Sequence, residues 1–427
     1  MKKVVLCMIC VSIGLYACQS EGLAIKEDLP EQPSPTDDVA SAKPREDILL
    51  TKAEEAVLHG NNVFAFNLLK EVFENEGKES NIFISPLSAT LALAMLNNGA
   101  VGVTQEQIQT ALGYGGQTRE DVNSYFRKMV NAMHELDEYV RFESANSIWI
   151  SNLFPVLSPF KEVNQTYFEA EVRNVDYSDP ATLGLINGWI AEKTHDLIPD
   201  FFSRLDPDTR MALINALYFK GSWTRPFDSE NTKDAPFYNA NGATQNVAMM
   251  DFGKEVRLNY LQEDAFELVE LPYGNEAFCM TLLLPRKDVS LASIIENLNA
   301  AAWDDCLSKL HLNTVIVRLP RFKIEYTRPL NDDLKALGMT SMFMFGNADF
   351  SLISNESSVV SSVSQKTFIE VNEEGTEAAA VTGIIVGTAF PDLPVQPPVL
   401  EFNRPFVYFI KEKSTGSVFF AGVMRNL

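Results

Sequence analysis

Apolar residues recur along this chain first with a helical spacing and later with a strand spacing. Between Ala53 and Glu76 they return every three or four positions, and the segment from Leu87 to Leu96 is apolar almost throughout. Both patterns predict helices that pack against a core. A third helix is expected to begin at Thr104, with Gln107 in the capping-box position, and to end at Leu112-Gly113.

Short apolar runs become frequent after residue 140, and these predict strands. The expected strands include Ala145–Trp149, Met211–Phe219, Thr281–Leu284, Val315–Leu319, Lys366–Val371 and Val418–Gly422. Helices first and strands later, with further helices between them, are typical of an α+β fold. No linker, repeat or change of composition interrupts residues 47–427, so we expect a single domain there.

The first 46 residues differ from the remainder. Lys2 and Lys3 precede an apolar run, Val4 to Ala17, that suits a signal peptide and is too short to span a membrane, which takes ~20 residues. The tetrapeptide Leu15-Tyr16-Ala17-Cys18 resembles the bacterial lipobox, so we expect removal of residues 1–17 and lipidation of Cys18. An ordinary signal peptide that contains a chance cysteine is the alternative.

Residues 18–46 carry four prolines, many acids and few large apolar side chains, which predicts a flexible acidic linker behind the lipid. The expected location is that of an exported bacterial lipoprotein, whose lipid anchor is its only contact with a membrane. Gln19 is compatible with sorting to the outer membrane, and Ser20-Glu21 is compatible with display at the cell surface.

Composition excludes several classes of protein. A chain of 427 residues, 46% hydrophobic and 22% charged, is neither disordered throughout nor a disulfide miniprotein. The 35 basic and 57 acidic residues give a net charge of -22, which repels nucleic acid. Four scattered histidines, and the lack of Walker, GxSxG and HExxH motifs, propose no metal, no cofactor and no catalytic residue. A serine or cysteine triad that assembles across the fold stays open at this stage. A disulfide between Cys279 and Cys306 is possible and is not required.

The most informative segment follows the predicted strand Lys366–Val371. About two dozen residues there contain no Lys or Arg and many small side chains, and such a long loop in a compact domain is usually functional. With a period of two, Thr376, Ala378, Ala380 and Thr382 share one face, and Glu377 lies on the other. The segment could therefore become a central strand without burying a charge. A surface loop rich in Ala and Gly is the alternative.

Several motifs, in order, resemble the serpin family over residues 48–427. They are Asn81–Ser88, similar to the serpin shutter; Asn215–Trp223, similar to the third strand of the central sheet with its breach tryptophan; Leu319–Ile324; Glu373–Ala380, similar to the reactive-loop hinge; Phe402–Phe406; and Phe420–Gly422. The resemblance implies a large central β-sheet, further sheets, about eight to nine helices and an exposed reactive-centre loop over about residues 373–399.

The resemblance also implies roles for single residues. The implied hinge residues are Glu373, Glu374, Gly375, Thr376, Glu377, Ala378, Ala379 and Ala380. The implied shutter and breach residues are Ser85, Ser88, Asn215, Trp223 and Gln365. Gln365 departs from the family pattern, because many members have a histidine there, and the shutter hydrogen bonds are expected to be rearranged.

The activity that the resemblance implies is suicide inhibition of proteases. A protease cleaves the loop and forms an acyl-enzyme, and the hinge then inserts into the main sheet and carries the covalently bound protease to the far pole. The usual spacing from Glu373 places the scissile bond at Ala389-Phe390. The inhibitor itself contributes no catalytic group and is expected to be a monomer, and no basic helix suggests a heparin-type cofactor.

The target protease is an open question at this point. No Lys or Arg lies between Glu377 and Leu400, which argues against a trypsin-like enzyme. Ala389 favours an elastase-like serine protease, while a chymotrypsin-like enzyme that recognises Phe390 and a papain-like cysteine protease stay open. Two further hypotheses are a non-inhibitory serpin that acts as carrier or chaperone, and an exported binding lipoprotein or hydrolase outside the family. Small residues on the inserting face of the hinge argue against the carrier.

Overall fold

The structure, a computed structural model, describes residues 43–196, 198, 200–376 and 396–427, without side-chain detail at 143–145 and 215–217. Its α-helices among these residues are α1 (Lys52–Asn75), α2 (Pro86–Asn97), α3 (Gly102–Ala111), α4 (Arg119–Glu135), α5 (Ser158–Phe168), α6 (Ala181–Lys193), α7 (Leu291–Asn297), α8 (Ala300–Lys309) and α9 (Asn331–Ala336). Two 3-10 helices are η2 (Ser229–Asn231) and η3 (Ser341–Phe343).

Side-chain caps define where two of the long helices begin. The Thr51 hydroxyl accepts a hydrogen bond from the Glu54 backbone N–H, and the Glu54 carboxylate accepts one from the Thr51 N–H at 2.7 Å, which closes a capping box ahead of α1. Thr118 and Asp121 form the same arrangement ahead of α4. The predicted helices over Ala53–Glu76 and Leu87–Leu96 are confirmed as α1 and α2.

The predicted start of the third helix was wrong. α3 begins at Gly102, and Thr104 lies fully buried inside the helix instead of capping it. The Thr104 hydroxyl accepts a hydrogen bond from the Asp349 N–H, and the Gln107 side-chain oxygen accepts one from the Ser341 N–H. Both side chains therefore hold a distant loop, a tertiary use that a local capping pattern does not reveal.

Each expected strand lies within an observed one. The strands are β1 (Ile82–Ile84), β2 (Val140–Ser151), β3 (Glu171–Val175), β4 (Met211–Ser222), β5 (Lys233–Tyr238), β6 (Thr244–Asp251), β7 (Val256–Gln262), β8 (Phe266–Pro272), β9 (Phe278–Pro285), β10 (His311–Pro320), β11 (Phe322–Pro329), β12 (Ser362–Val371), β13 (Gly375–Thr376), β14 (Val399–Glu401), β15 (Phe406–Glu412) and β16 (Val418–Met424).

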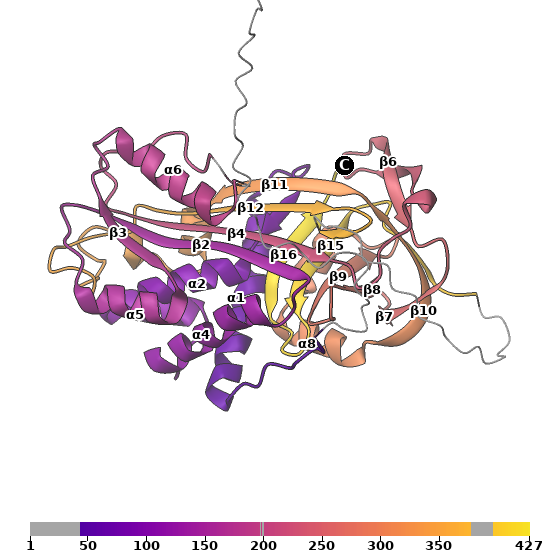
Figure 1. Cartoon of the computed structure of the whole chain (residues 1–427), viewed down its shortest axis with the longest axis horizontal. Helices are drawn as coiled ribbons and strands as arrows, with labels where there is room; N and C mark the ends of the chain where they lie inside the picture. The colour runs from indigo at the N-terminus through magenta and orange to yellow at the C-terminus, as the bar shows by residue number, and fades with distance from the viewer. Residues whose placement is uncertain (1–42, 197, 199, 377–395) are drawn as a thin grey trace, which may run out of the picture. The chain divides into compact units, whose positions relative to one another are not determined.

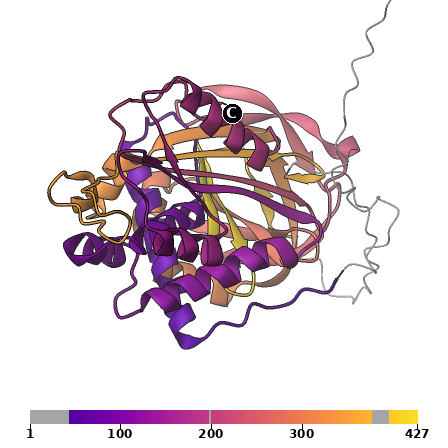
Figure 2. The same ribbon diagram turned by 60° about the vertical axis from the view of Figure 1, so that its left-hand side comes forward.

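The strands form two sheets, which confirms the predicted α+β fold. A six-stranded sheet has the order β11-β12-β13-β4-β2-β3, and a ten-stranded sheet has the order β1-β16-β15-β9-β8-β7-β10-β6-β5, with β14 added beside β10. Figure 1 shows α6 on one face of the six-stranded sheet and α1, α2, α4 and α5 on the other. Figure 2 gives the same arrangement from a second direction.

Two apolar clusters hold these layers together. The larger one fills the space between the sheets and the helices α1, α2 and α4, and it includes Met211, Leu213 and Phe219 on the inner face of β4. The smaller one lies beneath α6 and includes Ala212 and Ile214. Successive residues of β4 therefore point into different clusters, as the pleat of a strand requires.

Cys279 and Cys306 are both buried free thiols, so the disulfide left open by the sequence is not formed. Burial raises the pKa of Cys279 to about 12 and the pKa of Cys306 to about 11, which keeps both thiols protonated and unreactive at neutral pH. Among the described residues, the helices include none with the length and apolar character needed to cross a membrane.

Candidate functional site

The candidate site is the boundary between β12 and β4, which we call the seam. Seven residue pairs, from Ser362 opposite Ala212 to Phe368 opposite Tyr218, join the two strands in parallel. Beyond Tyr218 the strands diverge, and β13 lies between them. Thr376 pairs antiparallel with Val371 of β12 and with Gly221 of β4. The first residues of the predicted hinge thus already occupy one end of the seam.

Gly375 makes this close approach possible. The turn that leads to it is held by the Asn372 side chain, whose oxygen accepts hydrogen bonds from the N–H groups of Glu374 and Gly375. A Cβ atom on Gly375 would lie 2.1 Å from the Gly221 carbonyl oxygen, so no other residue fits against β4 there. Glycine at this position is a steric requirement of the paired hinge.

Thr376 is buried against an aromatic pair. Its hydroxyl lies 2.7 Å from the Tyr273 hydroxyl, and the Tyr273 ring stacks on Trp223 with 4.4 Å between ring centroids. The Trp223 indole N–H donates to the Asn372 carbonyl at 3.0 Å, and the Trp223 backbone N–H donates to Glu374. Burial raises the pKa of Tyr273 well above its ordinary value, so the hydroxyl keeps its proton.

Glu373 holds the beginning of the hinge in place through its carboxylate. Both of its carboxylate oxygens accept hydrogen bonds from Arg321 Nε, at 2.8 and 2.6 Å, and the Thr232 hydroxyl donates to the same carboxylate. Burial of Glu373 raises its pKa, but the hydrogen bonds from Arg321 and Thr232 outweigh this and hold the pKa below its ordinary value. Glu373 is therefore ionised at neutral pH.

Gln365 lies midway along the seam and is tied to the chain beneath it. Its side-chain oxygen accepts from the Ser85 N–H at 2.9 Å, and its amide N–H donates to the Ser85 carbonyl at 2.8 Å. The Ser85 hydroxyl donates to the Phe419 carbonyl and, as the N-cap of α2, accepts from the Ser88 N–H. The neutral amide of Gln365 thus joins the seam to the beginning of α2.

The predicted site residues that the structure describes lie in two groups along the seam. Hinge residues 373–376 lie beside Trp223 at one end, and Ser85 and Ser88 lie beside Gln365 midway along it. Gln365 pairs with Asn215 across the seam, although the Asn215 side chain is not described. Glu377, Ala378, Ala379, Ala380, Ala389, Phe390 and Cys18 lie outside the described residues. The roles of the hinge, shutter and breach residues in insertion stay predictions.

Three residues of the site were missed at the sequence level: Tyr273, Thr232 and Arg321. Each contacts a hinge residue that lies 52 to 141 positions away along the chain. Arg321 lies in the motif Leu319–Ile324, so the sequence singled out this segment without indicating its contact with Glu373. Nothing in the local sequence around Tyr273 or Thr232 indicates a partner in the hinge.

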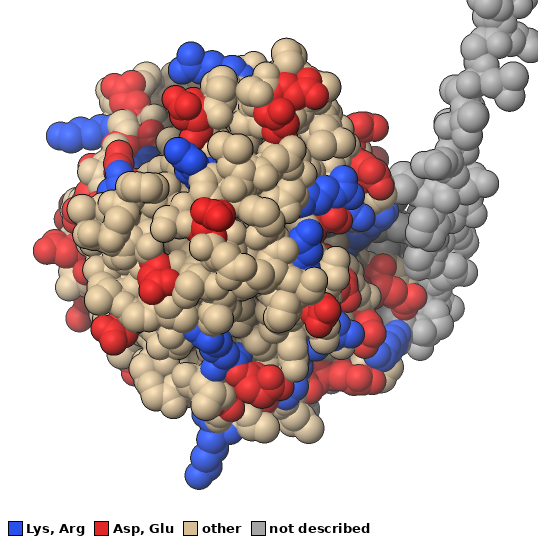
Figure 3. Space-filling model, turned by 90° about the vertical axis from the view of Figure 1, so that its left-hand side faces the viewer, with Lys and Arg blue, Asp and Glu red and all other residues tan. Residues whose placement is uncertain are grey.

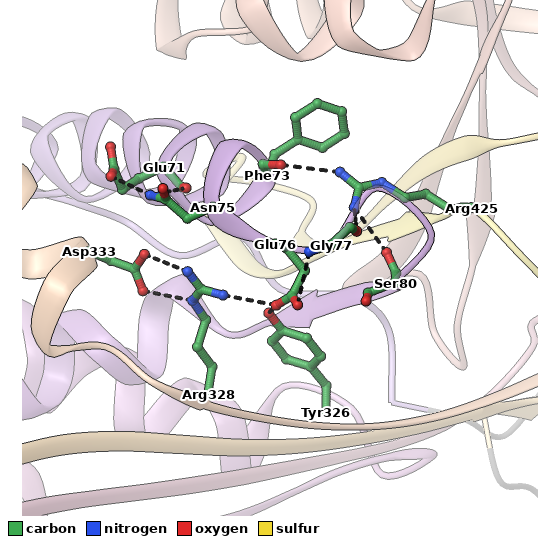
Figure 4. Close-up of polar contacts among 10 residues, drawn as sticks. All are labelled: Glu71, Phe73, Asn75, Glu76, Gly77, Ser80, Tyr326, Arg328, Asp333 and Arg425. Carbon is green, nitrogen blue, oxygen red and sulfur yellow. Dashed lines mark hydrogen bonds and ion pairs between the residues drawn. The ribbon is translucent and has the colours of Figure 1, made fainter. Parts of the chain in front are cut away.

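One flank of the seam is tied to the helical layer, as Figure 4 shows. Arg328 of β11 donates to both carboxylate oxygens of Asp333 at 2.7 Å and to Glu76, beyond the end of α1, at 2.8 Å. Tyr326 of β11 donates to the same Glu76 carboxylate. Arg425 donates to backbone carbonyls at and just after the end of α1. β11, and β12 beside it, are thereby fixed to the helices.

Comparison with known proteins gives a consistent result. The family model described as Serpin (serine protease inhibitor) matches residues 59–427. Iripin-2 of Ixodes ricinus is 33% identical over 386 residues, which cover 89% of this chain and 96% of Iripin-2. Human neuroserpin is 33% identical over 355 residues, which cover 81% of this chain and 86% of neuroserpin.

Solved structures extend the likeness to the fold. The native state of the thermophilic serpin tengpin superposes with a TM-score of 0.80 at 31% identity and covers 90% of this chain and 97% of tengpin. Human thyroxine-binding globulin in complex with its ligand gives a TM-score of 0.78 at 25% identity, over 88% of this chain and 99% of the globulin. The chain belongs to the serpin family, whose members generally inhibit proteases by the serpin mechanism and are not themselves enzymes.

Proposed function

We propose that this serpin is a suicide inhibitor of a serine protease, and that its loop, once cleaved, inserts along the seam between β12 and β4. The observation that supports this most directly is the position of β13, where Gly375 and Thr376 already pair with β4, and Thr376 also pairs with β12. The hinge needs only to continue in the same direction. The small residues that follow Thr376 on its face fit a strand that enters a closed sheet.

Hydrogen bonds supply the driving force for this insertion. The native seam has seven parallel pairs, and an inserted strand replaces them with two antiparallel ladders, one on each side. Each additional backbone hydrogen bond contributes about 0.5 to 1.5 kcal/mol. Residues 376–389 would extend roughly 45 Å as a strand, so the attached protease would be moved from one end of the sheet to the other.

The likeness to thyroxine-binding globulin means that the fold alone does not separate an inhibitor from a carrier. The hinge provides the distinction. A proline or a charged residue on the inserting face would hinder insertion, whereas this chain has Thr376, Ala378, Ala380 and Thr382 there. We therefore favour the inhibitor.

The proposed target is an elastase-like protease that cleaves Ala389-Phe390. A small specificity pocket accepts Ala389, and a protease whose pocket requires Lys or Arg finds neither between Glu377 and Leu400. The test is to incubate a soluble fragment, residues 46–427, with elastase and to examine the products by denaturing electrophoresis and intact mass. A complex that survives denaturation, with a released peptide that begins at Phe390, is expected.

Two further outcomes distinguish the competing functions. Cleavage without a stable complex would contradict inhibition and favour a carrier or chaperone. If elastase does not cleave the loop, the elastase assignment is wrong, and the same assay with chymotrypsin-like and papain-like proteases then tests the inhibitor itself.

The proposed location is the outer membrane, where Cys18 carries the lipid and residues 19–46 connect it to the domain. This proposal rests on the lipobox-like tetrapeptide before Cys18. Iripin-2 and neuroserpin are animal proteins and have no bearing on a bacterial anchor. Metabolic labelling with a fatty acid in a bacterial host should label the wild-type protein and not Cys18→Ser, and equal labelling of both would contradict the lipid anchor.

A further inference from the structure

We propose that a cavity at the beginning of β4 and β12 is the receptor for the side chain of Ile385 once the cleaved loop has inserted. The cavity has a volume of about 520 Å³ and combines an apolar part with a polar one. Its lining residues are Tyr177, Phe202, Leu205, Pro207 and Ala212, with the polar or charged Arg204, Asp206, Thr209, Ser361 and Ser362. It lies at the end of the seam farthest from the hinge. The proposal rests on the loop insertion proposed above and adds the place where the inserted strand is held.

The register of β13 identifies the occupant. Thr376 opposes Gly221 of β4 in an antiparallel pair, so each step forward along the loop matches one step back along β4. Nine residues after Thr376 is Ile385, and nine residues before Gly221 is Ala212. An inserted strand without a bulge therefore places Ile385 opposite Ala212.

The register against the other neighbour, β12, is consistent with this. Thr376 also opposes Val371, and nine residues before Val371 is Ser362. Ala212 and Ser362 are themselves paired in the native seam. Both ladders therefore place Ile385 between Ala212 and Ser362, and both of these residues line the cavity.

The direction of the side chain is fixed as well. Residues that are paired across a sheet point to the same face. Ala212 lies in the apolar cluster beneath α6, with Tyr177, and so Ile385 would point toward α6, where the cavity is. The same rule turns Thr376, opposite Gly221, toward the inner face, and this agrees with its contact to Tyr273.

The sizes of the loop residues match this arrangement. The residues on the face of Ile385 are Glu377, Ala379, Val381, Gly383, Ile385 and Gly387. Ile385 is the largest apolar side chain of this set, and glycines flank it on both sides. Gly383 would oppose Ile214, which is itself buried beneath α6 and does not line this cavity. The bulky side chain therefore lies beside the cavity, and a glycine lies opposite the buried isoleucine.

The experiment compares the melting temperature of the purified protein before and after loop cleavage, for the wild type, Ile385→Asp and Leu393→Asp. The protease is one that cuts between residues 387 and 391, with the cut mapped by intact mass, so that Ile385 stays on the inserting side and Leu393 does not. We expect cleavage to raise the melting temperature of the wild type and Leu393→Asp equally. The rise should be smaller for Ile385→Asp, by roughly 5 °C or more, because insertion would bury a charge.

Each result decides a separate point. An equal rise in all three proteins would overturn the assignment of Ile385 to the cavity and leave loop insertion intact. No rise in the wild type would contradict insertion itself, and with it the proposed function. As a second readout, the double variant Leu205→Cys and Ile385→Cys should form a disulfide under mild oxidation only after cleavage. Efficient crosslinking before cleavage, or none afterwards, would also count against the assignment.

Discussion

Thr376 is the residue on which loop insertion depends most directly. It is fully buried between β12 and β4, and its substitution by arginine would bury a guanidinium group there. We expect Thr376→Arg to convert the inhibitor into a substrate, with a stoichiometry of inhibition raised by at least about tenfold. Titration of a fixed amount of protease measures this stoichiometry.

A matched control for this prediction lies one residue further on. Glu377 falls on the opposite face of the inserting strand, so Glu377→Arg introduces the same group without burying it in the core. Its stoichiometry should stay within about twofold of the wild type. If both variants behave alike, the alternation of faces is not what governs insertion.

Tyr273 is expected to stabilise the native hinge through its hydroxyl group. In Tyr273→Phe the buried Thr376 hydroxyl loses its partner, and this costs about 1–3 kcal/mol in the free energy of unfolding. Urea unfolding of the uncleaved protein measures the loss. Adding Thr376→Val removes the orphaned hydroxyl, so the double variant should be no less stable than Tyr273→Phe. A fully additive loss would mean that the two hydroxyls do not interact.

Among the elements, the junction of α4 and β2 has a pH-dependent contact with the turn between β8 and β9. The Asp137 carboxylate accepts hydrogen bonds from the N–H groups of Tyr139 and Asn275. Burial nevertheless raises the pKa of Asp137 to about 6, from an ordinary 3.8. The folded protein thus favours the protonated acid, and this contribution to stability is complete below about pH 4 and is lost as the pH rises through 6.

Asp137→Asn should remove this part of the pH dependence. Melting curves at pH 5 and pH 7 measure it, and the wild type should lose more stability between these values than the variant, by about 1 kcal/mol. The comparison between the two proteins isolates Asp137 from the other carboxylates. Parallel changes in the wild type and the variant would show that Asp137 does not titrate in this range.

The helices and strands were predictable from the sequence to a greater extent than the contacts between them. The three-and-four spacing of apolar residues located α1, and continuous apolar runs located α2 and the strands of the seam, which are buried on more than one face. The alternation after Thr376 predicts an inserting strand, and this stays a prediction because the residues that follow Thr376 lie outside the described part of the chain. The contacts of Tyr273 with Thr376 and of Glu76 with Arg328 join residues 103 and 252 positions apart, and no local pattern encodes them. The use of Thr104 inside α3 was missed for the same reason.

On the scale of the whole molecule, the end at which β4 and β12 begin would receive the displaced protease. Figure 3 faces that end and shows charged residues sparse over its centre and more frequent toward its rim. Large apolar side chains are exposed in the loops there, among them Leu153, Met344 and Phe345. A chain with a net charge of -22 thus has a weakly charged face at this pole, and such a face tolerates a protease of either net charge.

The two flanks of the seam differ in how they can respond. β12 forms eight pairs with β11, and β11 is held to the helices by Arg328 and Tyr326. β4 belongs to the other flank, with β2, β3 and the helix α6 that covers them. We therefore expect insertion of a strand to move the β4 flank and to leave the β11 flank in place.

Hydrogen exchange before and after loop cleavage tests this division. The seam amides of β4 and β12 should exchange at least about tenfold more slowly after cleavage, because a filled sheet opens less often than a seam that must part. Amides of β7, which pairs with β8 and β10 in the ten-stranded sheet, provide the control and should change little. Unchanged exchange along β4 would mean that no strand has entered. Slowing confined to β7 and its neighbours would place the gain in stability in the ten-stranded sheet and not at the seam.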